Sequence, residues 1–417
     1  MTIRDHPLRA ALSQEMHVRR LPRLSVPCRA MQIVTVLAEA NTEAATAHIE
    51  ALMAEATVLV PLSAKFTIVA IGGITLIWER HTEFATYTLV RPGSTAEPFH
   101  PSDFDPLRGQ VYDGMPGEII RSTQIALVHD GGSDRSAADV AHWFSDEATI
   151  FCDVADGLAQ IVSDFRLNDD GYGRLLIRDR GLQRDEPAQL LLRLQELGNY
   201  RNMALLGLPL AQRLTPAVNS LETRLAELTQ AVSERTSEDD RLLDELTFLS
   251  AELARLVAET RYRMMATRAY AQLSIDRLAS LRIGVVRGYQ TLDDFTERRL
   301  MPALRTCNSF SARLDDLSQR AAWTSALLRT RIDIALARQN RDLLSSMDRR
   351  TQLQLRLQQT VEGLSVVAIS YYLVALIGYL LGVVEIIPHE IGMAVAVPLV
   401  MVGVALGLRW ARRHMIE

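Results

Sequence analysis

Residues 365–384 read SVVAISYYLVALIGYLLGVV, without one charged side chain. A second uncharged stretch, IGMAVAVPLVMVGVALGL, occupies residues 391–408, and only EIIPHE (residues 385–390) separates the two. A helix needs roughly 20 apolar residues to cross the hydrocarbon core of a bilayer. The sequence therefore predicts a C-terminal hairpin of two transmembrane helices, at residues 364–384 and 391–408, with the lipid bilayer as its partner.

Basic residues flank this predicted hairpin on its open side, whereas the short loop has none. The flanking arginines are Arg349, Arg350, Arg356, Arg409, Arg412 and Arg413. Because positive residues favour the cytoplasmic side, both termini are expected in the cytoplasm, including a basic tail at residues 409–417. The N-terminal residues lack the apolar run of a signal peptide, so we expect a multi-pass protein of the inner (cytoplasmic) membrane.

The composition argues against several classes of protein. The formal net charge is only −5 over 417 residues, so no nucleic-acid partner is expected. Cys28, Cys152 and Cys307 are isolated and odd in number, as in a reducing compartment, and their spacing predicts no zinc site. The sequence has no P-loop, Rossmann glycine motif or nucleophile elbow. We therefore expect no metal, no cofactor and no enzyme activity.

The N-terminal part, residues 1–186, alternates strand-like and helical segments and predicts an α+β or α/β cytoplasmic domain. The strand-like runs cover residues 31–37, 66–71, 75–80, 85–91, 119–128 and 174–177, and the helical ones residues 42–56 and 137–144. TLIWERHTEFATYTLV (residues 75–90) has β-branched and aromatic residues on both sides of a polar segment. This pattern is typical of an antiparallel hairpin.

The next part, residues 187–363, loses the strand pattern and predicts a long helical stalk. Two successive helices are expected to share a seam with the three- and four-residue steps of a coiled coil. The first has Leu221, Leu225, Leu228 and Val232, and the second Leu242, Leu246, Leu249, Leu253 and Leu256. The second helix of this seam is expected to bend near Gly284 and Gly288 and to stop at Met301–Pro302.

The end of the stalk, residues 303–362, contains no glycine or proline and leads into the first uncharged stretch. As one helix it would be about 90 Å long. An apolar stripe runs along it from Ile332 to Leu364. Such a helix is stable only when its stripe is buried, so its partner must be the preceding helix, neighbouring subunits, or both.

Three segments carry a family resemblance: HPLRAALSQEMHVRR (residues 6–20), WERHTEFATYT (78–88) and SSMDRRTQLQLRLQQTVEGLSVVAISYYLVALIGY (345–379). Together they resemble an uncharacterised bacterial family of membrane-anchored proteins, known only as a domain of unknown function. Two elements depart from the family pattern. His17-Val18-Arg19-Arg20 stands in place of His-x-Arg-Pro, and Leu197-Gly198-Asn199-Tyr200-Arg201 in place of a Glu-Thr-Tyr-Arg element. The resemblance implies no activity.

The order of parts also resembles the CorA-type divalent-cation channels. These have a cytoplasmic domain, a helical stalk continuous with the first span, a short acidic loop and a second span. The resemblance implies a homo-oligomer, such as a pentamer, that conducts cations. Gly382-Val383-Val384 stands where that type has Gly-Met-Asn, so Val384 replaces the asparagine implicated in receiving the hydrated ion.

Polar and small residues in the first uncharged stretch are pore-lining candidates. Ser365, Tyr372 and Tyr379 are seven residues apart, and Gly382 continues the neighbouring row of small residues. This face could line a pore in a ring of subunits. Alternatively, small residues permit close helix packing and the hydroxyl groups bond across helices.

Two further pairs of residues are candidates outside this face. Glu385 and Glu390 could form acidic rings at an outer mouth, or they could be ordinary solvated carboxylates. Gly403 and Gly407 form a G-x-x-x-G pair, which is typical of helix packing.

Two functions follow as hypotheses. The first is a CorA-like channel or transporter, for cations, with a cytoplasmic regulatory domain. The alternative is a membrane-anchored scaffold or sensor without transport activity, whose cytoplasmic domain binds a ligand or a protein. An enzyme ranks third, because no catalytic constellation is visible in the sequence.

Overall fold

The structure is a computed structural model. It describes residues 5–9, 12–13, 21–38, 41–63, 65–93, 97–130, 140–144, 149–234, 239–381 and 389–414. The chain divides into two compact units. The first comprises Met1–Arg235 with Asp244–Trp323, and the second Thr236–Leu243 with Thr324–Glu417.

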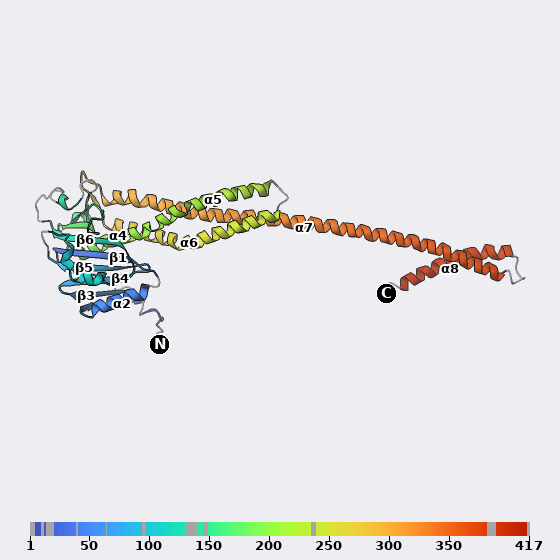
Figure 1. Ribbon diagram of the computed structural model, residues 1–417, viewed down its shortest axis with the longest axis horizontal. Coiled ribbons are helices and arrows are strands. Elements are labelled where there is room, and N and C mark those ends of the chain that lie inside the picture. Colours follow the sequence, from blue (N-terminus) through green and yellow to red (C-terminus); the bar gives the residue numbers. More distant parts are fainter. Residues whose placement is uncertain are drawn as a thin grey trace. The chain divides into compact units, whose positions relative to one another are not determined.

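The first unit is built on one mixed β-sheet, to which the described residues contribute ten strands (Figure 1). The strands are β1 (Cys28–Val36), β2 (Thr57–Val60), β3 (Phe66–Ile71), β4 (Ile74–Arg80), β5 (Phe84–Pro92), β6 (Glu118–His129), β7 (Ile150–Val154), β8 (Ala159–Ser163), β9 (Gly173–Asp179) and β10 (Gly284–Val285). Their order is β10-β7-β8-β9-β6-β1-β5-β4-β3-β2. β6 and β9 pair in parallel, and the other neighbouring strands pair antiparallel.

The hairpin predicted at residues 75–90 is confirmed as β4 and β5. Trp78 lies opposite Tyr87, and both side chains are fully buried. Their face of the sheet is covered by α2 (Thr42–Met53) and α3 (Leu107–Tyr112), which contribute Ile49 and Val111 to the same core. The alternation of apolar and polar residues therefore selects which face of these strands is buried.

The opposite face of the sheet packs against α4 (Glu186–Leu205). Leu190, Leu194 and Leu197 of this helix share a core with Ile125 of β6 and Ile177 of β9. α4 therefore holds the parallel strand pair from one side, and it brings its polar residues to the start of β6.

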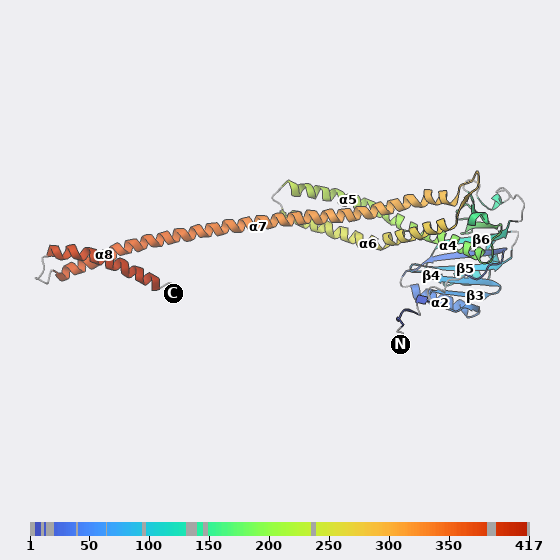
Figure 2. The same cartoon turned by 180° about the vertical axis from the view of Figure 1, so that it is seen from behind.

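Three longer helices follow: α5 (Gly207–Ser233), α6 (Asp239–Ser280) and α7 (Leu292–Leu381). α5, α6 and the first part of α7 lie side by side in both views (Figures 1 and 2). The leucines of the predicted seam are buried, and these are Leu221, Leu225, Leu228, Leu242, Leu246, Leu249, Leu253 and Leu256. Among the described residues the last helix is α8 (His389–His414).

The expected bend at Gly284 and stop at Pro302 are wrong. α6 already ends at Ser280, and residues 284–285 pair with the edge of β7 as β10. Gly288 has φ +86°, a left-handed conformation that suits the turn before α7. Pro302 lies inside α7, near its beginning.

The predicted C-terminal hairpin of two membrane spans is also wrong. In the part of the chain that the structure describes, only α7 has an apolar stretch long enough to cross a membrane, and this stretch is almost entirely unburied. The apolar part of α8 extends only from Ile391 to Gly407. At about 1.5 Å per residue it falls short of the roughly 30 Å of a hydrocarbon core. The fold is thus a mixed sheet followed by mostly helical chain with one candidate span.

Candidate anion-binding site

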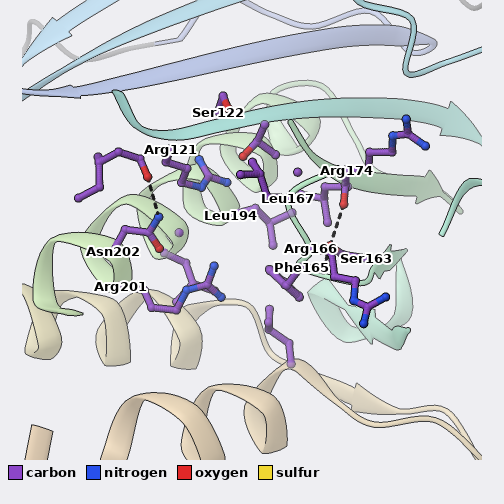
Figure 3. A pocket seen from close by; sticks show the side chains of 17 residues that line it. Arg121, Ser122, Ser163, Phe165, Arg166, Leu167, Arg174, Leu194, Arg201 and Asn202 are labelled. Carbon is purple, nitrogen blue, oxygen red and sulfur yellow. Dashed lines mark hydrogen bonds between the residues drawn. The ribbon is translucent and has the colours of Figure 1, made fainter. Parts of the chain in front are cut away.

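A cavity of about 260 Å³ lies in the first unit, between the start of β6, the start of β9, the turn after β8 and α4. Leu292, the first residue of α7, also lines it. Figure 3 shows the side chains of Arg121 and Arg201 entering this space from β6 and α4. Arg166 and Arg174 also line it, and Arg174 pairs with Asp170 at 3.4 Å.

Arg121 is held by neutral groups. Its Nη1 donates hydrogen bonds to Oε1 of Gln32, at 2.8 Å, and to Oδ1 of Asn199, at 2.9 Å. These amide oxygens orient the guanidinium group without neutralising its charge. Gly198 of α4 leaves the room that this guanidinium group occupies.

Arg201 is held mainly by aromatic rings. Its Cζ lies 4.8 Å from the ring centroid of Phe165 and 5.9 Å from that of Phe295. Phe165 and Phe295 stack on each other with centroids 4.9 Å apart. The Nη1 atom of Arg201 is buried and has no hydrogen-bond partner. A cation–π contact therefore fixes the plane of this group and leaves one strong donor unsatisfied.

The turn after β8 places Phe165 beside Arg201. Phe165 has φ +51°, a left-handed conformation that is strained for an aromatic residue. The Oγ atom of Ser163 stabilises the turn, because it accepts from the backbone N–H of Phe165 at 3.1 Å and donates to the carbonyl of Arg174 at 2.7 Å. Strained backbone of this kind is common at binding sites.

Burial, together with the positive charge of Arg201, lowers the pKa of Arg121 to about 9. Burial lowers the pKa of Arg201 to about 10. Both values are above 7, so both guanidinium groups remain protonated at neutral pH. Within the described ranges no carboxylate forms an ion pair with either one. Both residues are half-buried, and two neighbouring, unneutralised charges with little access to water are unfavourable unless an anion joins them.

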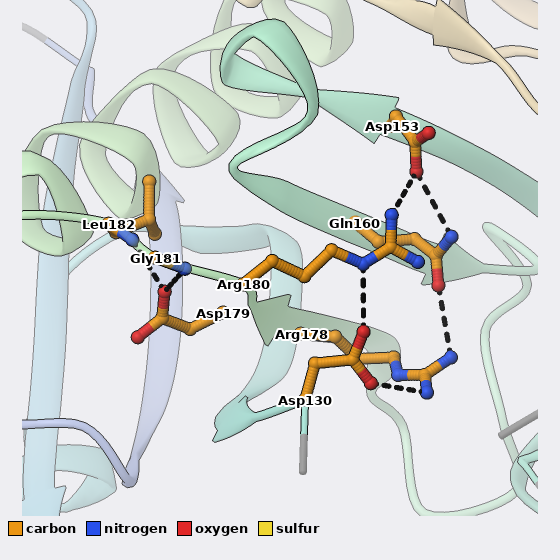
Figure 4. A network of polar contacts seen from close by, with 8 residues as sticks. All are labelled: Asp130, Asp153, Gln160, Arg178, Asp179, Arg180, Gly181 and Leu182. Carbon is orange, nitrogen blue, oxygen red and sulfur yellow. Dashed lines mark hydrogen bonds and ion pairs between the residues drawn. The ribbon is translucent and has the colours of Figure 1, made fainter. Parts of the chain in front are cut away.

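Other arginines of the sheet show the usual arrangement. Arg178 bonds to Asp130 at 2.5 Å, and Arg180 bonds to Asp130 at 2.8 Å and to Asp153 at 2.9 Å (Figure 4). Arg29, equally buried, is paired with Asp103. Each of these arginines has an opposite charge beside it. The ion pairs therefore stabilise the sheet and need no further anion.

The candidate residues predicted from the sequence lie elsewhere. Tyr372 and Tyr379 are 73% and 81% exposed on α7, and Oγ of Ser365 donates to the carbonyl of Val361 in the same helix. Gly382 and Glu385 lie outside the described residues, and so does the side chain of Glu390. Ser365, Tyr372 and Tyr379 do not line the cavity that holds Arg121 and Arg201.

The glycine pair of α8 does not pack on α7. A Cβ atom at Gly403 or Gly407 would meet no atom within 4 Å. The two helices meet instead at Gly378 of α7, where a Cβ atom would lie 3.3 Å from Sδ of Met393. Helix packing at Gly403 and Gly407 stays a prediction.

Sequence reasoning did not find Arg121 or Arg201 as a pair, because they lie far apart in the chain. One feature of the sequence did lie at this site. The element 197–201 departs from the resembled family pattern, and it contains both Arg201 and the glycine that makes room for Arg121.

The chain belongs to a family described as protein of unknown function (DUF3422), whose model matches residues 4–415. This match confirms the resemblance to an uncharacterised family. No curated protein matches the chain. The resemblance to CorA-type channels has no support from these comparisons.

Proposed function

We propose that this protein is a membrane-attached sensor whose sheet domain binds a small anion. The observation that carries the proposal is the pair Arg121 and Arg201, which share one cavity without a carboxylate partner in the described part of the chain. Guanidinium groups present several donors in a fixed plane and suit carboxylate and phosphate groups. Ser122 and Asn202 line the same cavity and supply further polar contacts.

The ligand should combine one anionic group with a small apolar body. Phe165, Leu194 and Leu292 form the apolar side of the cavity. A volume of about 260 Å³ accommodates a small molecule and excludes a large one. Membrane attachment rests on the apolar end of α7, which is uncovered in this structure.

Thermal unfolding of the purified full chain tests the anion site. Inorganic phosphate and benzoate serve as probes at constant ionic strength, with sodium chloride as the reference. A ligand at 100 times its Kd adds about 2.7 kcal/mol to the free energy of unfolding. We expect a rise in Tm with at least one probe for the wild type and none for Arg201→Gln.

Arg213→Gln is the matched control, because Arg213 is an exposed arginine on α5, paired with Glu259. It should respond to the probes as the wild type does. Equal responses of Arg201→Gln and the wild type would overturn the proposal, and so would the absence of any response. Membrane attachment is tested separately by alkaline carbonate extraction, in which an attached chain stays in the pellet.

A channel or transporter is the second candidate function. It is favoured by the exposure of Tyr372 and Tyr379, whose hydroxyl groups α8 does not cover. Reconstituted liposomes should then pass cations down a gradient, and Tyr372→Phe with Tyr379→Phe should change the rate. Liposomes that pass no cation under any tested gradient argue against this candidate.

A further inference from the structure

The first part of α7 has a covered apolar seam. Its buried residues recur at steps of three and four and include Leu300, Leu304, Leu314, Leu317 and Leu328. α6 contributes Ala271 to this packing beside Leu300 and Leu304. α5 contributes Glu222, which pairs with Arg313 of α7 at 2.5 Å.

The packing of α5 and α6 against α7 ends near Arg331 of α7. α5 ends at Ser233 and α6 begins at Asp239, which pairs with Arg331 of α7 at 2.8 Å. Every residue of α7 from Asp333 to Val361 is exposed. The helix therefore continues for roughly 43 Å, at about 1.5 Å per residue, uncovered by any described residue of its own chain.

The apolar seam nevertheless continues along this uncovered part. Its large apolar residues are Leu336, Leu343, Met347, Leu357, Val361 and Leu364, between 52% and 68% exposed. They occupy one face at steps of three, four, or sums of three and four, with Asn340, Arg350 and Gln354 at the intervening positions. Leu344 and Leu353 broaden the same face. An exposed stripe of this length marks an interaction surface.

Within the described residues, α5, α6 and α8 all leave the stripe exposed. The longest internal segment outside the described residues is 131–139, which spans at most about 30 Å even when fully extended. A second copy has a stripe of the same length and spacing. If the apolar end of α7 lies in a membrane, copies are also aligned in parallel and at the same height.

We propose that residues 333–362 of α7, here called the open stripe, pack in parallel against the same segment of a second copy. The seam is thus intramolecular up to Leu328 and intermolecular beyond it. Parallel alignment places Leu343 opposite Leu343 and Met347 opposite Met347. Asn340 would face its counterpart, and a buried Asn pair at such a position fixes the register of two helices. Arg350 and Gln354 interrupt the apolar seam between Met347 and Leu357, beyond which it continues with Val361 and Leu364.

Disulfide cross-linking tests this arrangement. The three native cysteines are buried, so a single introduced cysteine on α7 is the reactive one. Leu343→Cys and Met347→Cys should give cross-linked dimers of the full chain in membranes under copper phenanthroline. Arg341→Cys, two residues away on the opposite side of the helix, is the matched control and should give at least tenfold less dimer.

A second variant separates association from folding. Leu343→Asp with Leu357→Asp changes only exposed residues, so the thermal unfolding of the sheet domain should stay unchanged. The detergent-purified wild type should sediment as an oligomer and this variant as a monomer. A monomeric wild type, cross-linking as strong at Arg341→Cys as at Leu343→Cys, or a disulfide from Leu343→Cys to a different protein would each overturn the proposal.

Discussion

Gly198 of α4 lies directly against the guanidinium group of Arg121 on β6. A Cβ atom at Gly198 would come within 2.7 Å of Nε and 2.8 Å of Cζ of Arg121. Glycine in a helix interior is less favourable than alanine by about 1 kcal/mol. The position of Arg121 in the cavity is therefore obtained at the expense of helix stability.

Gly198→Ala should separate binding from stability. The new methyl group displaces Arg121, a flexible side chain, while alanine favours the helix. We predict an unchanged or slightly higher Tm and an affinity for the anionic probe that is about tenfold weaker, which corresponds to about 1.4 kcal/mol. Calorimetric titration measures the affinity. Gly363→Ala, where a Cβ atom meets no atom within 4 Å, should leave it unchanged.

Arg201→Met should stabilise the protein in the absence of ligand. The substitution removes a charge that is unneutralised in the described structure and keeps a long apolar side chain beside the stacked rings of Phe165 and Phe295. We predict a gain of about 1 kcal/mol in the free energy of unfolding, measured with urea. Arg178→Met should instead lose stability, because it leaves Asp130 with one partner fewer. A loss for Arg201→Met as large as that for Arg178→Met would contradict the difference we infer between an arginine without a carboxylate partner and one that is paired with Asp130.

The paired strands β4 and β5 illustrate what a sequence can predict. Their alternating pattern and short polar connection are local, so the hairpin is predictable. β7 and β8 are short apolar runs joined at Asp156-Gly157, a turn signal that the prediction overlooked, and β10 has only two residues. Its strand character comes from pairing with β7, which no local pattern encodes.

The site was less predictable than the sheet for a related reason. Arg121 becomes a site residue only because α4 packs over the start of β6. In the sequence it is one of many arginines. The candidates chosen instead, such as Tyr372, share a helical spacing, and spacing alone does not show what faces them.

His48 should make stability depend on mildly acidic pH. Its Nε2 lies 3.1 Å from the carbonyl of Val111, and burial lowers the pKa of His48, although the Val111 carbonyl and Asp113 oppose this shift. The unfolded chain therefore binds the proton more readily than the folded one. The contribution is fully present above about pH 6.5 and is lost as the pH falls through the folded-state pKa.

Urea unfolding at pH 7 and pH 5 measures this effect. The wild type should lose more stability on acidification than His48→Gln, whose side chain can still donate to Val111. Equal losses for the two proteins would show that other groups account for the pH dependence.

The native cysteines should be inert in the folded protein. Burial raises the pKa of Cys28 and Cys152 to about 11 each, and it also raises that of Cys307. At pH 8 only about one thiol in a thousand is then the reactive thiolate at Cys28 or Cys152. We predict that Ellman's reagent reacts at least 100-fold more slowly with the native protein than in urea. A rapid reaction of one equivalent would contradict the burial of these thiols.

Strand β10 also sets when the sheet can be completed during synthesis. Its residues Gly284 and Val285 pair with Asp153 and Cys152, and Gln290 bridges to Ile150. The ribosome must therefore add roughly 130 residues after β7, including all of α5 and α6, before this edge has its partner. At about 5–20 residues per second this takes on the order of 10 seconds. Over that interval the nascent sheet has an open edge at β7, the kind of edge that pairs with other chains. Chaperones that bind extended edges therefore have their longest opportunity while the helices are still being translated.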